Sequence, residues 1–195
     1  MTWRTALEDP VFLTFFWILS GLLVGGGVLL FVIRLATGKK LDHACRSYVG
    51  WLIMVPIFLG AVFLGRTTTM ALFLLLALMG FKEFARGTGL YRDWWMTGVV
   101  YLGIVTVATC CWMDEPEFHR KGWLGMFLAL PAFAIALIIT VPILLDRTKG
   151  QLQLMALASI GFIYIGWMFG HLSFLANSPN AYGYVMYLVL AVQVN

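Results

Sequence analysis

Apolar residues run along this chain in six long stretches without Asp, Glu, Lys or Arg, and short charged clusters separate them. A helix needs about 20 apolar residues to cross the roughly 30 Å hydrocarbon core of a bilayer. The last stretch, 150–195, is too long for one crossing, and the polar residues of 177–180 interrupt it. The pattern therefore predicts an all-α, polytopic transmembrane helical bundle of about seven helices, over 11–33, 48–65, 68–85, 95–112, 123–145, 151–175 and 182–195.

The composition favours a membrane protein over a soluble one. Hydrophobic residues make up 62% of the chain and charged residues 11%, whereas a soluble domain is nearer half apolar and a quarter charged. The longest polar segment, 38–48, is too short to fold alone, and no soluble domain is visible. We therefore expect 1–195 to form a single transmembrane domain.

The basic residues indicate an orientation. If alternate connections face the cytoplasm, starting with 34–46, that side holds nine Lys and Arg residues and the opposite side holds four. The positive-inside rule then places the N-terminus outside. The net charge of +4 thus follows from topology and does not indicate nucleic-acid binding. Attraction of the basic connections to anionic lipid headgroups is an alternative that stays open.

The third predicted helix carries the most unusual charges. Only 15 uncharged residues separate Arg66 from Lys82, so the helix must continue through Lys82 and Glu83 to cross. Glu83 and Arg86 are spaced i, i+3 and can pair on one helix face. Glu83 is then either a structural counter-ion or a group beside a substrate cavity, because ionisable residues at membrane depth usually face an interior or a polar cavity. Either role predicts that Glu83 matters more than an acid in an outer loop, such as Glu117.

Other candidate groups have simpler interpretations. His171 could relay protons or bind metal, but no second ligand stands at a recognisable spacing, so a structural hydrogen bond is favoured. The three cysteines, Cys45, Cys110 and Cys111, form no metal or disulfide pattern and are expected to be packing residues. We therefore expect no complete active site and no metal site within 1–195.

Three segments together resemble the phosphatidate cytidylyltransferases, which are CDP-diacylglycerol synthases. The first, ALMGFKEFARGTG at 77–89, contains Glu83 followed by an aromatic residue late in an early helix. The second, at 158–177, is similar to the family helix that precedes the catalytic region. The third, YVMYLVLAVQVN at 184–195, resembles the helix that leads into an Asp-containing metal site. The Ser/Lys/Asp-rich family signature is absent from this sequence.

The resemblance implies a metal-dependent transfer of CMP from CTP to phosphatidate, with release of pyrophosphate. Its expected cofactor is a divalent metal such as Mg²⁺, and its expected partners are CTP and the membrane lipid, with no nucleic acid; a homodimer stays open. The candidates beside the substrate cavity are Lys82, Glu83, Arg86 and Asn195. The expected location is a bacterial inner membrane. The sequence is expected to stop short of the catalytic segment, so that 1–195 alone would be inactive.

Two other classes remain open at this point. A non-catalytic membrane scaffold or partner subunit would need no active site. A small transporter is disfavoured because the chain shows no internal repeat of the kind that many transporter folds carry.

Overall fold

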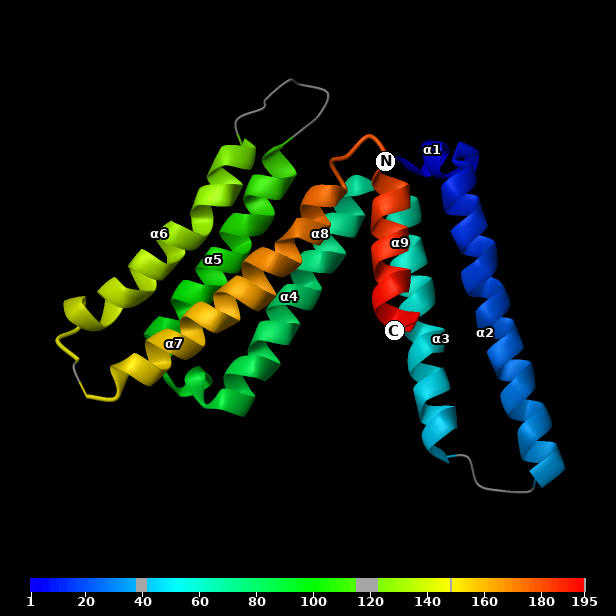
Figure 1. The fold of residues 1–195 in the computed structure, drawn as a ribbon, viewed down its shortest axis with the longest axis horizontal. Helices are drawn as coiled ribbons and strands as arrows, with labels where there is room; N and C mark the ends of the chain where they lie inside the picture. The colour runs from blue at the N-terminus through cyan, green and yellow to red at the C-terminus, as the bar shows by residue number, and fades with distance from the viewer. Residues whose placement is uncertain (38–41, 115–122, 148, 195) are drawn as a thin grey trace. The chain divides into compact units, whose positions relative to one another are not determined.

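The structure of the protein, a computed structural model, describes residues 1–37, 42–114, 123–147 and 149–194 and is built from helices (Figure 1). Lys39, Lys40, Glu117 and Asn195 lie outside these residues. No β-strand forms within the described ranges, so the predicted all-α class is confirmed. The elements are α1 (Trp3–Glu8), α2 (Pro10–Thr37), α3 (Asp42–Leu64), α4 (Arg66–Thr88), η1 (Leu90–Arg92), α5 (Trp94–Met113), α6 (Trp123–Leu144), α7 (Gln151–Gly161), η3 (Phe162–Met168), α8 (Phe169–Leu175) and α9 (Ala181–Val194).

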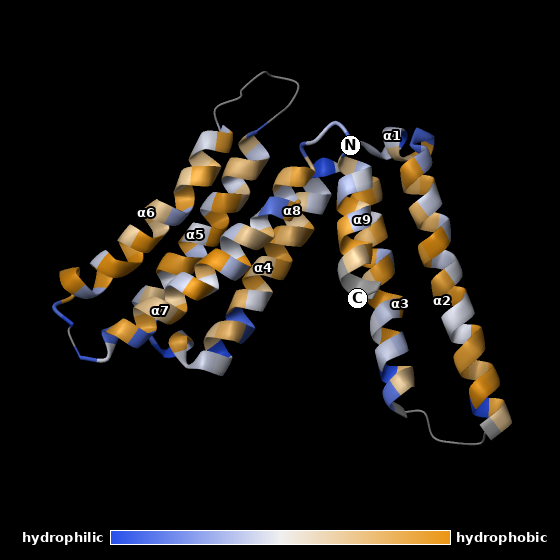
Figure 2. Cartoon of the chain, viewed as in Figure 1, coloured by the Kyte–Doolittle hydropathy of each residue, from blue (hydrophilic) through white to orange (hydrophobic). Residues whose placement is uncertain are grey.

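Six helical segments of the described chain are long and apolar enough to cross a membrane. Apolar residues dominate them along most of their length, and polar residues gather toward their ends (Figure 2). They are α2, α3, α4, α5, α6 and the continuous run Gln151–Leu175. The predicted membrane helices are therefore present, while the seventh corresponds to α9, whose 14 residues are fewer than one crossing needs.

Helix boundaries differ from the predicted ones where charged residues continue a helix. Residues 42–48 of the polar segment 38–48 are helical, because α3 begins at Asp42. Likewise α4 continues through Lys82 and Glu83 to Thr88, as the short uncharged stretch required. The length of an uncharged stretch therefore underestimates the length of the helix, since a helix can extend into the lipid headgroup region, where charged side chains reach water.

The chain divides into two compact units. The terminal unit comprises Met1–Thr69 and Tyr182–Asn195, and the central unit comprises Met70–Ala181. Each is described by itself below, and the single transmembrane domain stays a prediction.

In the terminal unit, the short helix α1 is fastened to the turn between α3 and α4. The backbone N–H of Arg66 donates to the Met1 carbonyl (3.4 Å), and the Tyr182 hydroxyl donates to the Thr2 carbonyl (2.9 Å). Gly65 makes the turn with φ +121°, and a side chain there would meet the Met1 carbonyl at 3.0 Å. A glycine is required at this position, because L-residues with a side chain rarely adopt that backbone conformation.

Side chains that follow the same turn donate hydrogen bonds to carbonyl groups at the end of α3. The hydroxyl of Thr68 donates to the carbonyls of Ala61 (2.7 Å) and Gly65 (2.8 Å), and that of Thr69 donates to the Gly65 carbonyl (2.8 Å). The last four carbonyls of a helix have no intrahelical partner. The two threonines therefore let α3 end and α4 begin with little polar backbone left unsatisfied.

In the central unit, small residues bring one long helix against α5. The segments α7, η3 and α8 form one continuous helix whose middle, Phe162–Met168, has π-helical hydrogen bonding. A side chain added at Gly103 of α5 would meet the Phe162 ring at 2.7 Å, and one added at Gly170 would collide with Val107. Glycines at helix contacts allow such close approach in membranes. The Gly166-x-x-x-Gly170 pair thus packs within this chain.

A proline in α6 leaves a carbonyl that a tryptophan satisfies. Pro131 has no N–H, so it cannot donate to the Phe127 carbonyl four residues earlier. The indole Nε1–H of Trp167 donates to that carbonyl instead, at 2.9 Å. The Trp167 ring also stacks on the Phe127 ring, with 6.0 Å between centroids. This pair connects α6 to the π-helical segment through both polar and apolar contact.

We predict that Trp167→Phe lowers the thermal unfolding midpoint in detergent, because it leaves the Phe127 carbonyl unsatisfied, at a cost of about 1–3 kcal/mol. In a Pro131→Ala background the restored N–H can donate to the carbonyl, so the same substitution should cost clearly less. A double-mutant cycle measures this coupling. Trp94→Phe, at a side chain that is 81% exposed, is the control. Equal losses in both backgrounds would show that the hydrogen bond contributes nothing.

Candidate functional site

Charged side chains gather at one end of the central unit, where α4 and α6 end and α5 and α7 begin (Figures 1 and 2). We call this the charged end, and within the described residues it includes Lys82, Glu83, Arg86, Arg92, Asp93, Asp146, Arg147 and Lys149. Five of these eight side chains are basic and three are acidic. The balance favours anionic ligands over cationic ones.

The last turns of α4 carry the three candidates that the sequence singled out. Arg86 Nη1 lies 3.7 Å from Glu83 Oε1, and the two side chains are 58% and 73% exposed. An exposed pair of this kind contributes only about 0.3–0.5 kcal/mol. The Arg86 guanidinium also lies over the Tyr91 ring, 5.8 Å from its centroid. Lys82 is exposed on the same helix.

The structure does not place Glu83 in either of two cavities of the described residues. One cavity, of about 500 Å³, belongs to the terminal unit, and the other, of about 10 Å³, belongs to the central unit. Other residues line both. The counter-ion and cavity-side roles of Glu83 therefore both remain predictions.

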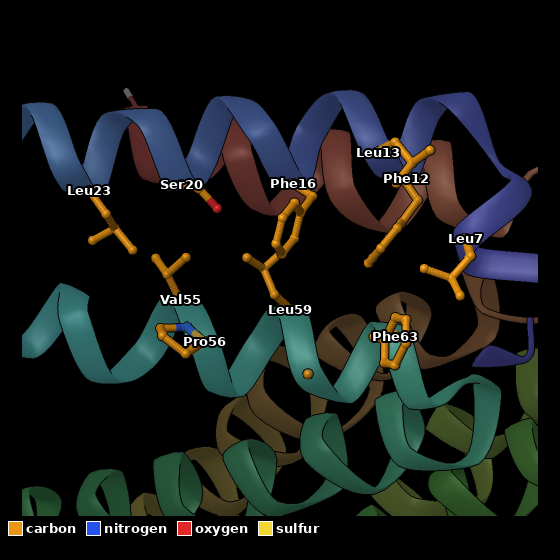
Figure 3. Close-up of a pocket in the computed structure, with 11 residues that line it drawn as sticks. Leu7, Phe12, Leu13, Phe16, Ser20, Leu23, Val55, Pro56, Leu59 and Phe63 are labelled. Carbon is orange, nitrogen blue, oxygen red and sulfur yellow. The ribbon is translucent and has the colours of Figure 1, made fainter. Parts of the chain in front are cut away.

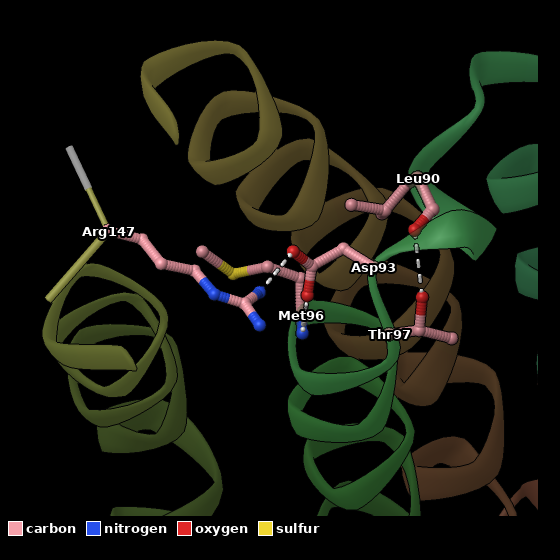
Figure 4. A network of polar contacts seen from close by, with 5 residues as sticks. All are labelled: Leu90, Asp93, Met96, Thr97 and Arg147. Atoms are coloured by element: carbon pink, nitrogen blue, oxygen red, sulfur yellow. Dashed lines mark hydrogen bonds and ion pairs between the residues drawn. The ribbon is translucent and has the colours of Figure 1, made fainter. Parts of the chain in front are cut away.

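A more buried ion pair stands beside this group. Asp93 Oδ2 accepts a hydrogen bond from Arg147 Nη1 at 3.1 Å (Figure 4). Its other oxygen, Oδ1, accepts from the backbone N–H of Met96 at 3.0 Å and caps the N-terminus of α5. The Asp93 side chain is 11% exposed and that of Arg147 is 45% exposed. One carboxylate thus starts α5 and holds the end of α6 against it.

Local hydrogen bonds fix the turn on each side of this pair. The Leu90 carbonyl accepts from the Thr97 hydroxyl (3.0 Å), as Figure 4 shows. It also accepts from the Asp93 N–H (2.9 Å). After α6, the Arg147 N–H donates to the Pro142 carbonyl at 2.9 Å. Asp146 takes a left-handed conformation with φ 50°, which Asp tolerates better than most residues. The turn therefore presents Arg147 toward Asp93.

Sequence reasoning missed this ion pair. Asp93 directly before an apolar run carries a readable signal, since Asp is a preferred N-cap residue. Its pairing with Arg147, 54 residues away, has no local signal. Tertiary packing alone brings the two turns together.

His171 lies in a different part of the central unit. Its Nδ1 is 3.0 Å from the Trp167 carbonyl, and its ring packs against those of Phe127 (4.8 Å) and Trp167 (4.7 Å). About 20 residues of helix separate it from the start of α7, which is roughly 30 Å along the axis. The structure therefore does not bring His171 to the charged end.

The described residues do not fit the metal that the resemblance implied. Among them, no group of three or more His, Cys, Asp or Glu side chains comes together to hold an ion. Asn195, expected near the metal site, lies outside the described residues. No chemical step is therefore assigned to a metal.

The charged end also has an aromatic border suited to a membrane surface. Tyr91, Trp94 and Trp95 are exposed beside the basic residues, and Trp and Tyr are enriched at the level of lipid headgroups. Guanidinium and ammonium groups at that level can bind phosphate oxygens. The arrangement is that of a helical membrane protein with basic and aromatic side chains gathered at one end of its long apolar helices.

Comparison with known proteins identifies the family. The sequence model of the cytidylyltransferase family matches residues 46–195, which extends from α3 through α9 and includes the whole charged end. This chain therefore belongs to the cytidylyltransferase family, a family of CTP-using transferases, and the predicted resemblance is confirmed at this level. No curated protein and no solved structure matches the chain.

We predict that Asp93→Ala destabilises the protein more than Arg147→Gln does, because the alanine loses both the helix cap, worth about 1 kcal/mol, and the ion pair. Asp93→Asn keeps the cap but removes the charge, so it should resemble Arg147→Gln, at about 0–1 kcal/mol for a half-exposed pair. Thermal unfolding in detergent measures all three. An Asp93→Asn loss as large as that of Asp93→Ala would show that the charge matters more than the cap.

Proposed function

We propose that this protein is an integral membrane enzyme that transfers CMP from CTP to phosphatidate, forming CDP-diacylglycerol. The observation that carries the proposal is the cytidylyltransferase match over residues 46–195 in a chain with six helices able to cross a membrane. A CTP-using transferase built into a bilayer has a membrane lipid as its most accessible acceptor. Phosphatidate supplies the phosphate monoester that such a transfer requires.

The proposed reaction is a displacement at phosphorus. An oxygen of the phosphatidate phosphate attacks the α-phosphorus of CTP, and the bond from that phosphorus to the β-phosphate oxygen breaks. The bonding electrons leave with pyrophosphate, so CMP becomes joined to the lipid. Two anions must meet, and catalysis of phosphate transfer depends mainly on positioning and on offsetting charge.

The charged end supports this chemistry because it offers cations at headgroup level. Lys82, Arg86 and Arg92 are exposed on one connected stretch of α4 and η1, where they can bind phosphate oxygens of the lipid or of CTP. The Glu83–Arg86 pair is proposed to orient the guanidinium there. A requirement for a divalent ion such as Mg²⁺ remains part of the proposal, without an assigned ligand.

The proposed test uses the intact protein, purified and returned to liposomes that contain phosphatidate, with radiolabelled CTP and Mg²⁺ in the buffer. We expect labelled CDP-diacylglycerol and an equal amount of pyrophosphate. Replacing phosphatidate with diacylglycerol should abolish the product, because it lacks the phosphate. Turnover with an equally presented prenyl phosphate, but not with phosphatidate, would reject the proposed substrate and retain the transferase.

Substitutions test the part played by the charged end. Lys82→Gln should lower CDP-lipid formation by about tenfold, because it removes one charge-assisted contact to phosphate. Glu83→Gln should lower it as well, because the Arg86 guanidinium loses the partner that orients it. Glu8→Gln, at an exposed acid of α1, is the matched control and should keep full activity. If folding yield falls while activity per folded molecule holds, Glu83 is a structural counter-ion.

The proposed location is a bacterial inner membrane with the N-terminus outside and the charged end in the cytoplasm, where CTP is available. In a variant without the native cysteines, Lys149→Cys should resist a membrane-impermeant maleimide in intact cells and react in inverted vesicles. Asp114→Cys, at the other end of α5, should show the opposite pattern. Labelling of both positions from the same side would reject the proposed topology.

A further inference from the structure

The terminal unit contains an elongated apolar groove between α2 and α3, which we call the α2–α3 groove (Figure 3). Its volume is about 500 Å³, within the range of ligand pockets. Phe12, Phe16 and Leu23 point into it from α2, while Val55, Leu59 and Phe63 face them from α3 (Figure 3). Among its lining side chains, Ser20 alone carries a polar atom. Such a lining can bind hydrocarbon but offers almost nothing to a polar ligand.

The groove has the length of one lipid tail. Its lining on α2 extends from Phe12 to Leu23, which at 1.5 Å per residue is about 16 Å along the helix. The hydrocarbon core of a bilayer is about 30 Å thick, so one leaflet is about 15 Å deep. Both walls belong to helices that are long and apolar enough to cross the membrane. An acyl chain of a single leaflet therefore matches the groove in length and in chemistry.

A tyrosine joins α2 to α3 at one end of the groove. The Tyr48 hydroxyl of α3 donates to the Leu23 carbonyl of α2 at 2.9 Å. A side chain added at Gly27 would meet that hydroxyl at 2.5 Å, so the glycine lets the ring lie against α2. The two helices are thus fastened together just beyond the last lining residue. Leu23 lies near the middle of α2, so the groove covers about half of this helix.

The opposite end of the groove lies at α1 and offers a cation. Leu7 of α1 contributes to the lining and is 55% exposed, so the groove is open at this end. Arg4 stands three residues before Leu7, on the same face of α1, with its guanidinium over the Trp3 ring at 5.0 Å. Asp9 at this end already accepts the N–H groups of Val11 and Phe12 (2.9 Å each). Arg4 therefore supplies a cation on the short helix that borders this end of the groove.

We propose that the α2–α3 groove is a binding site for one phospholipid, with an acyl chain between α2 and α3 and its phosphate at α1 beside Arg4. The site belongs to the terminal unit and uses none of the residues assigned to CMP transfer. Phospholipid bound there fills space between two membrane helices that otherwise face each other across a gap. The inference does not depend on the reaction that the protein catalyses.

The test uses the intact protein in nanodiscs that contain a phosphatidylglycerol with a diazirine on its acyl chain. After photolysis, mass spectrometry maps the residues that carry the label. We expect label concentrated on 12–23 and 55–63, with about one lipid per chain at saturation. A uniform distribution over all exposed helix faces would overturn the proposal, because it would indicate only the surrounding lipid.

Two glycines of α3 provide a matched pair of variants. An added Cβ meets nothing within 4 Å at Gly60, which lines the groove, or at Gly50, which does not. Gly60→Trp should fill the groove and reduce labelling of 12–23 and 55–63 by about tenfold, whereas Gly50→Trp should leave it unchanged. Equal labelling in the two variants would overturn the proposal. If Gly60→Trp prevents folding, Gly60→Leu replaces it in the same comparison. If neither variant folds, the labelling map of the wild-type protein alone tests the proposal.

A second copy of the chain is the competing occupant. In a variant without native cysteines, Ser20→Cys would then form a disulfide-linked dimer in high yield, which would overturn the proposal. Under the proposal, Ser20→Cys stays monomeric under oxidising conditions and reacts with a lipid-soluble maleimide more slowly when phosphatidylglycerol is present. Arg4→Gln should lower retention of that lipid while retention of a neutral diacylglycerol stays unchanged.

Discussion

The need to satisfy backbone polar groups inside hydrocarbon controls most of this structure. A bilayer offers no water to an unpaired N–H or C=O, so each such group must find its partner within the protein. At three such points in the described residues, a side chain supplies the missing partner. Trp167 donates to the carbonyl that Pro131 leaves unsatisfied, and Thr68 and Thr69 donate to carbonyls at the end of α3. The amide of Asn177 donates to the Cys111 carbonyl near the end of α5, at 2.8 Å.

These polar contacts also decide which helices lie together. They join neighbouring helices or the turns at their ends, while close apolar packing, such as that of Gly103 against Phe162, brings other helices together. In lipid, apolar contact alone gives little preference for one neighbour over another, since the lipid tails are equally apolar. Hydrogen bonds at helix ends and at prolines, together with close contacts at glycines, therefore determine which helices pack together. In a soluble protein, burial of apolar side chains would contribute more to that choice.

Charge follows the opposite rule and collects at the helix ends. The charged end of the central unit places five basic side chains beside exposed Trp and Tyr residues. The α2–α3 groove has the opposite chemistry, because almost all of its lining side chains are apolar. We propose separate roles for the two features. The charged end binds phosphate groups, which needs water and ions, and the α2–α3 groove binds a lipid tail, which needs their exclusion.

The sequence alone determined the helical membrane class, the position of the long apolar helices, the extension of α4 through Lys82 and Glu83, and the resemblance to cytidylyltransferases. These properties depend on local composition, on the length of a membrane crossing and on short segments of chain, so neighbouring residues in the sequence are enough to predict them. The Asp93–Arg147 ion pair, the Trp167–Phe127 hydrogen bond and the α2–α3 groove could not be read in that way. Each joins residues of different helices or turns that are 32 or more positions apart, and neither partner carries a local signal for the other. Only the packing of the helices decided them, because distance in space between such residues is fixed by the fold and not by their spacing in the chain.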